Sequence, residues 1–129
     1  QREILTPPGP GLDLGKSLGL PMSTLVRGGD FIFVAGLVAV DPATGKRLPG
    51  TVASETRQIL ANLKQMLEAA GSSLDNVVKL TAILHSMLEA PSLNEVCMKV
   101  FPDPPPARTV CGARLPDGVK VMIECTALA

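Results

Sequence analysis

Residues 51–71 read TVASETRQILANLKQMLEAAG, a pattern that predicts the clearest helix of the chain. Apolar residues recur at three- and four-residue spacing from 52 to 70, so they share one face of the helix. Thr51 can cap the first turn, Glu55 lies near the positive end of the helix dipole, and Gly71 suits the left-handed residue that ends a helix. The apolar face consists of Val52, Ile59, Leu60, Leu63, Met66, Leu67 and Ala70.

Two strands are predicted before this helix. Residues 24–27 form a short strand, Gly28-Gly29-Asp30 a turn and Phe31–Val40 a buried strand rich in Val, Ile and Phe, which together make a hairpin. Residues 41–45 (Asp-Pro-Ala-Thr-Gly) supply the turn that ends the second strand. Residues 6–22 are rich in proline and glycine, so they are expected to be extended and irregular.

A strand, a helix and two further strands are predicted after residue 71. Val77–Leu84 forms the strand, and Pro91 opens the helix, which a run of prolines ends. Arg108–Ala113 and Val119–Ala127 form two strands joined as a second hairpin by Leu115-Pro116-Asp117-Gly118. The apolar stripe of the second helix consists of Leu93, Val96, Cys97, Val100 and Phe101, and the prolines are Pro102, Pro104, Pro105 and Pro106.

The resulting order, β-β-α-β-α-β-β, predicts a single α+β domain over residues 1–129. Strands separated by helices need crossover connections, so both helices should pack on one face of a mixed sheet. No element is left to cover the other face. The chain is also 46% apolar with a mean hydropathy of +0.30, which is high for a small domain. We therefore expect another subunit to cover that face.

Composition argues against several classes of function. Twelve basic residues balance twelve acidic ones, and Trp and Tyr are absent, so neither a basic surface nor an aromatic platform for nucleic acid is expected. The longest apolar run is too short to span a membrane. Three scattered cysteines suit reduced thiols. These features, with no signal-peptide layout at the N-terminus, favour a cytoplasmic protein that binds neither nucleic acid nor membranes.

Few side chains could carry chemistry. His85 is the only histidine and is most simply exposed or capping, and Cys97 is most simply a core residue. No metal-ligand spacing and no phosphate loop occurs, so no metal or cofactor is predicted. Arg108 follows a stiff run of prolines and could clamp a carboxylate, although a surface or salt-bridge arginine fits as well. Glu124 could act as an acid or base if buried, but it could equally face solvent.

The sequence resembles the reactive intermediate deaminase A (RidA) family, the YjgF-type proteins. The matching motifs run along most of the chain in the family's order and spacing, which makes their combination specific although each alone is weak. They are Phe33-Val34-Ala35-Gly36, residues 41–45, residues 55–63, Leu67-Glu68-Ala69-Ala70-Gly71, Val77-Val78-Lys79-Leu80-Thr81, Asn94-Glu95-Val96, Phe101, Pro106-Ala107-Arg108-Thr109, Ala113-Arg114-Leu115-Pro116 and Ile123-Glu124.

The resemblance implies a chorismate-mutase-like fold, a homotrimer with clefts between subunits, and hydrolysis of 2-imino or enamino acids to 2-keto acids and ammonia without a cofactor. Arg108 matches the family's arginine and would hold the substrate carboxylate. The backbone N–H of Val110 would help to orient it, and Asn94 matches the family's asparagine on the second helix.

The chain departs from the family at several polar positions. Met22 replaces the family's tyrosine, and Ala35 and Leu37 replace a serine and a glutamine. Met122 replaces the glutamate that positions water, whereas Glu124, two residues on and on the same strand face, matches the next glutamate. Met22, Leu37 and Met122 would make the cleft apolar and adaptable.

Two functions from different classes remain open on these residues. The first is a RidA-like deaminase. The second is a trimer that binds small carboxylic acids without converting them, which the two methionine replacements favour. A chaperone-like or ribonuclease role is a third possibility, but the zero net charge and the single histidine argue against a ribonuclease. The physiological substrate is not encoded in any motif.

Overall fold

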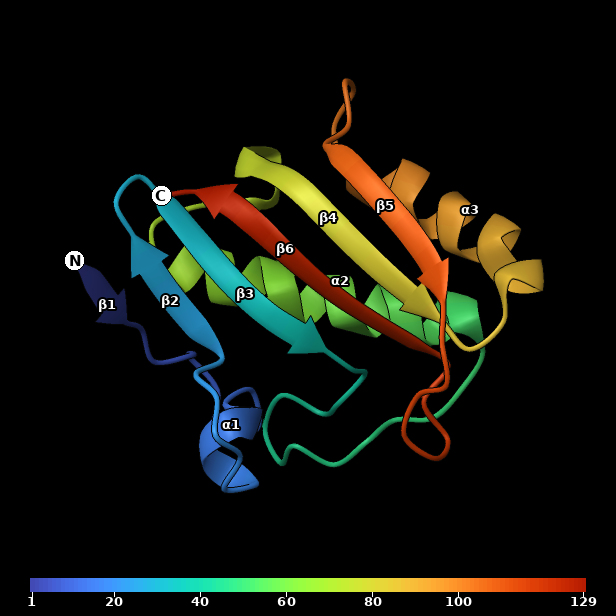
Figure 1. Cartoon of the computed structure of the whole chain (residues 1–129), viewed down its shortest axis with the longest axis horizontal. Coiled ribbons are helices and arrows are strands. Elements are labelled where there is room, and N and C mark those ends of the chain that lie inside the picture. Colours follow the sequence, from blue (N-terminus) through green and yellow to red (C-terminus); the bar gives the residue numbers. More distant parts are fainter.

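The computed structural model describes all 129 residues as one six-stranded sheet and three helices (Figure 1). The sheet order is β1-β2-β3-β6-β4-β5. The strands are β1 (Arg2–Ile4), β2 (Leu25–Gly28), β3 (Phe31–Leu37), β4 (Val77–Leu84), β5 (Ala107–Gly112) and β6 (Val121–Leu128). The helices are α1 (Leu14–Ser17), α2 (Val52–Ala69) and α3 (Ala90–Val100), with 3-10 turns at Leu74–Asn76 and Met87–Glu89. None of the helices is long and apolar enough to cross a membrane.

Two crossover connections organise the sheet, as predicted. Because β3 and β4 are both antiparallel to β6, they run parallel to each other, and α2 joins them. Helix α3 joins β4 to its parallel neighbour β5. Figure 1 shows α2 and α3 on the same face of the sheet, so the predicted mixed sheet with helices on one face is confirmed.

Helix α2 follows its sequence signals closely. Thr51 and Ser54 form a reciprocal capping box, and Gly71 has a φ of +83° in the left-handed region that an L side chain rarely adopts. The predicted apolar positions from Val52 to Leu67 are almost fully buried. The periodicity of residues 52–70 therefore identified the centre of the core.

The predicted second hairpin is wrong, because β5 and β6 are not neighbours. β6 lies between β3 and β4, while β5 is the edge strand. The physical reason lies in the burial patterns. Alternate residues of β6 are almost fully buried, whereas most residues of β5 are exposed, so the central position buries the more apolar strand. The buried residues of β6 are Val121, Ile123, Cys125 and Ala127.

Three smaller expectations also need correction. β3 ends at Leu37 rather than Val40, because its pairing with β6 is interrupted by a bulge between Val34 and Leu37. Leu37 is buried in the core instead of facing a cleft. Residues 6–22, expected to be irregular, contain the single turn of α1, where the Asp13 carboxylate accepts a hydrogen bond from the backbone N–H of Lys16. The short edge strand β1 was not predicted.

The face of the sheet opposite α2 and α3 has no covering element in this chain. Phe31 and Phe33 stand on it with 40% and 47% of their surface exposed, and their ring centroids are 6.4 Å apart. Leu128, paired with Phe31, is also exposed. We call this surface the open face. Its exposed aromatic side chains agree with the expectation that one face of the sheet lacks cover within a single chain.

Candidate functional site

A cavity of about 600 Å³ lies between α3, the segment that follows it, and the edge of the sheet. Its walls are both apolar and charged, whereas a second hollow of about 500 Å³ near residues 6–17 has no hydrophobic side chain in its lining apart from prolines. Its size lies within the range of sites for small molecules. Its lining consists of Leu80, Asn94, Cys97, Met98, Phe101, Pro102, Asp103, Pro105, Pro106 and Arg108.

Arg108 is the cation of this cavity. It stands second in the edge strand β5 and pairs with the buried Leu80, so its side chain lies on the helix side of the sheet. It forms no ion pair with any acidic side chain of the chain. Of the two alternatives, the salt-bridge arginine is therefore not observed, whereas the surface arginine is, because Arg108 is exposed at the rim of the cavity. The three consecutive prolines before the strand stiffen the backbone that carries Arg108, and its guanidinium, free of any acidic partner, can bind a carboxylate through two parallel hydrogen bonds.

Asn94 and Cys97 project from α3 into the same cavity. The Oδ1 atom of Asn94 is buried and accepts no hydrogen bond, which leaves polar capacity at the site unused. Burial raises the pKa of the Cys97 thiol, and the nearby positive charge of Arg108 partly offsets this effect. Cys97 is thus a protonated part of the wall at neutral pH, as well as the core residue that the sequence indicated.

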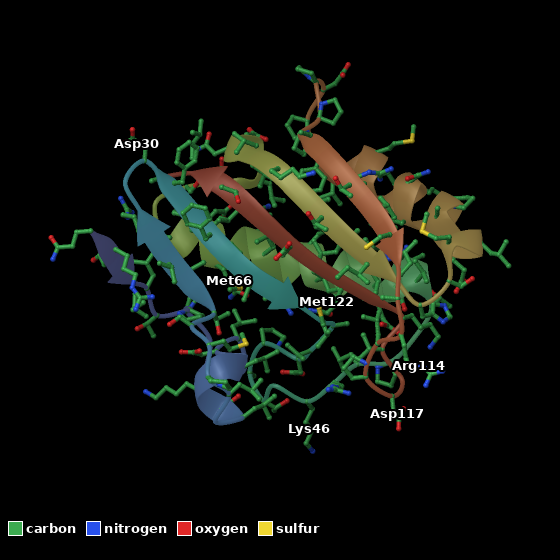
Figure 2. All side chains as sticks on the ribbon, in the orientation of Figure 1. Asp30, Lys46, Met66, Arg114, Asp117 and Met122 are labelled. Atoms are coloured by element: carbon green, nitrogen blue, oxygen red, sulfur yellow. The ribbon has the colours of Figure 1, made fainter.

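Glu124 and Met122 lie on the open face of the sheet, away from the Arg108 cavity. Glu124 is exposed and stands beside Thr81, next to a hollow of about 140 Å³. The solvent-facing alternative is therefore the observed one. Met122, labelled in Figure 2, packs over Gly36, where an added Cβ would stand 2.8 Å from the methionine sulfur.

Within one chain, the predicted site residues fall into separate groups. Arg108 and Asn94 share the cavity, and Val110 lies on the same side of β5, packed against the core. Met22 precedes β2, on the far side of the sheet from β5, and its carbonyl lies against Gly15. A single copy therefore does not bring Met22, Met122 or Glu124 to Arg108.

Asp103, the anion of the Arg108 cavity, was not among the residues predicted from the sequence. The available signal was an acidic residue enclosed by Pro102 and Pro104, in a segment that leads directly to Arg108. His85 is half-exposed and contacts Glu89 one turn on, outside this cavity. No three His, Cys, Asp or Glu side chains come together in a way that could hold a metal ion.

Comparisons with known proteins agree with the resemblance seen in the sequence. The family model described as "Endoribonuclease L-PSP" matches residues 19–129. A "RutC family protein" of Pyrococcus horikoshii is 41% identical over 113 residues, which cover 87% of this chain and 89% of that protein. The mouse protein named "2-iminobutanoate/2-iminopropanoate deaminase" is 38% identical over 109 residues, covering 84% and 81%.

The fold agrees as well. The crystal structure of RidA from an Antarctic Psychrobacter superimposes with a TM-score of 0.79 at 32% identity, covering 84% of this chain and 89% of that one. The family model and these relatives together show that this chain belongs to the endoribonuclease L-PSP family, the YjgF/RidA family.

Proposed function

We propose that this protein is a deaminase that hydrolyses 2-imino and enamino acids to 2-keto acids and ammonia. One observation carries the proposal: an arginine without an acidic partner lines a cavity of about 600 Å³ whose other walls are mostly apolar. Such a cavity suits a small acid with an apolar side chain. Relatives named for imine deamination support the choice of reaction.

The reaction requires few catalytic groups. In R–C(=NH)–COO⁻ + H₂O → R–CO–COO⁻ + NH₃, the carbon attacked is already electrophilic. Arg108 would hold the carboxylate, and the backbone N–H of Val110 and the side chain of Asn94 would orient it. Holding the substrate beside a water molecule then supplies the main rate gain, because it removes the entropy cost of bringing the two together. No cofactor is required.

We further propose that the working unit is a homotrimer with its sites between subunits, in a chorismate-mutase-like arrangement. Two observations support an assembly: the open face exposes Phe31 and Phe33, and Glu124 lies on the face opposite to Arg108. A neighbouring copy packed on the open face could bring its Arg108 cavity toward Glu124 or Met122. Sedimentation of a monomer would contradict this arrangement.

A deaminase fits the residues better than the ribonuclease activity in the family's description. The chain has zero net charge and one histidine, which is in contact with Glu89. Binding to a phosphate backbone normally requires an excess of basic side chains. General acid–base cleavage of RNA commonly uses a pair of groups that can exchange protons, whereas the lining of the Arg108 cavity contains no histidine and, apart from Arg108, only Asp103 and the Cys97 thiol, whose pKa burial raises.

The test is hydrolysis of freshly made imines. An amino acid oxidase generates imines from alanine, leucine and methionine, and semicarbazide competes for them. Wild-type protein should speed imine loss, Arg108→Ala should abolish the effect, and Arg108→Lys should restore only part of it because a lysine cannot form the two parallel hydrogen bonds.

Arg114→Ala is the matched control, since Arg114 is an exposed arginine beyond the end of β5 that does not line the cavity. It should leave the rate unchanged. If wild type accelerates no imine but binds 2-keto acids through Arg108, the protein is a carboxylic-acid binder rather than a deaminase.

A further inference from the structure

The Arg108 cavity carries two opposite charges that do not meet. Arg108 and Asp103 both line it, yet neither belongs to a salt bridge within 4.0 Å. The charged atoms of the two side chains are thus more than 4.0 Å apart, so they do not pair with each other. A cation and an anion held apart across one cavity form a pair of anchors for a ligand that carries both charges.

The backbone keeps the two anchors in place. Pro102 and Pro104 flank Asp103, and Pro106 stands two residues before Arg108, so φ is fixed at most positions between the two charged residues. Asp103 therefore cannot swing freely toward Arg108. Figure 1 shows this segment as the connection from α3 to β5 at the edge of the sheet.

We propose that Asp103 binds the cationic nitrogen of ligands whose carboxylate is held by Arg108. The cavity would then select molecules with a carboxylate and an adjacent ammonium or protonated imine, with the apolar side chain against Leu80, Phe101 and Met98. This inference rests on the proposed function for the identity of the substrate, which would bind as its protonated imine. A protonated imine is also the form more open to attack by water.

The same arrangement predicts what the cavity rejects. A second carboxylate on the ligand would approach Asp103 and be repelled, so dicarboxylic acids should bind poorly. Loss of the negative charge at position 103 should relax this exclusion. The selection is a property of the ground-state complex, so it should appear in KM more than in kcat.

Two ligands of the same size test the proposal by calorimetry: 2-aminobutanoate, which carries an ammonium group, and 2-hydroxybutanoate, which does not. Wild-type protein should bind the amino acid roughly threefold to fivefold more tightly, the upper part of the range for an exposed ion pair. Asp103→Asn should abolish this preference while leaving the affinity for 2-hydroxybutanoate unchanged, and Asp103→Glu should restore part of it. Arg108→Ala should weaken the binding of both ligands.

Asp117→Asn is the control, because Asp117 is an exposed aspartate in the β5–β6 loop that does not line this cavity. It should keep the wild-type preference. A wild-type protein that shows no preference for 2-aminobutanoate, or an Asp103→Asn variant that retains it, overturns the proposal. If the preference depends on Asp103 but no imine is hydrolysed, the inference about Asp103 stands and the proposed deaminase activity fails.

Discussion

Glu55 gives the sharpest prediction about stability. This carboxylate is 2% exposed in the first turn of α2 and accepts hydrogen bonds from two backbone N–H groups, those of Gly50 and Lys120, each at 3.0 Å. It also lies 3.7 Å from the Lys120 ammonium. Lys120 comes directly before β6, and its own carbonyl accepts from the backbone of His85. Glu55 thus connects the start of α2 to the start of the central strand.

The cost of Glu55→Ala follows from these contacts. Each hydrogen bond to a charged group contributes about 1.5–3 kcal/mol, so the two together set a range of about 3–6 kcal/mol. The partly exposed ion pair adds less than about 1 kcal/mol. A hollow of about 90 Å³ borders Glu55, and water entering it can hydrate the two N–H groups. We therefore expect a loss near the lower end, about 3 kcal/mol.

Urea unfolding followed by circular dichroism, at one fixed protein concentration, measures this loss. With a slope of about 2 kcal/mol per molar urea, the midpoint should fall by about 1.5 M. Glu55→Gln keeps one uncharged acceptor and should lose about half as much. Glu68→Ala, at an exposed position of the same helix, should change the free energy of unfolding by less than about 0.5 kcal/mol. A Glu55→Ala loss below about 1 kcal/mol would refute the connecting role.

Four further predictions concern the thiols, the end of α2 and a buried hydrogen bond. At pH 8 the folded protein should show one fast-reacting thiol, the exposed Cys111, because Cys97 and Cys125 are buried. Titration of the thiols with and without denaturant counts the reactive cysteines in each state. Burial raises the pKa of Cys125 from 9.0 to about 12. Because the thiol of the unfolded chain ionises at a lower pH than that of the folded protein, the free energy of unfolding should fall as pH rises from 9 to 12. This decline should be smaller in Cys125→Ala. Gly71→Ala should lower the free energy of unfolding by about 1–2 kcal/mol, because residue 71 has a left-handed backbone conformation. Asn62→Ala should lower it by about 1–3 kcal/mol, because the buried carbonyl of Val40 loses the hydrogen bond that the Asn62 side chain donates. Thermal unfolding tests both.

The helices and most strands could be predicted from the sequence because their signals are local. Capping at Thr51 and the left-handed Gly71 mark the ends of α2, and the prolines after Phe101 end α3. The pairing of β5 and β6 could not be predicted in the same way. Proximity along the chain favours a hairpin, whereas the observed order depends on which strand the whole sheet buries.

The site was predictable in part for a similar reason. Arg108 and Asn94 could be identified by resemblance, and the structure places both in one cavity. The contribution of Asp103 depends on the path of the proline segment between α3 and β5, which the hydrophobic periodicity of the sequence does not predict. Likewise, the opposite facing of Arg108 and Glu124 follows from their pairing with Leu80 and Thr81, consecutive residues of β4, and the partners of both strands were predicted wrongly.

The central place of β6 sets the order in which this protein can fold as it is synthesised. β6 follows every other strand in the chain, yet it supplies the only hydrogen-bonded link between β3 and β4. Until it leaves the ribosome, the sheet consists of two separate pieces, the three strands β1–β2–β3 and a β4–α3–β5 unit, whose inner edges are unpaired. The sheet therefore closes only after translation has passed residue 128, and earlier intermediates expose strand edges that a molecular chaperone could bind.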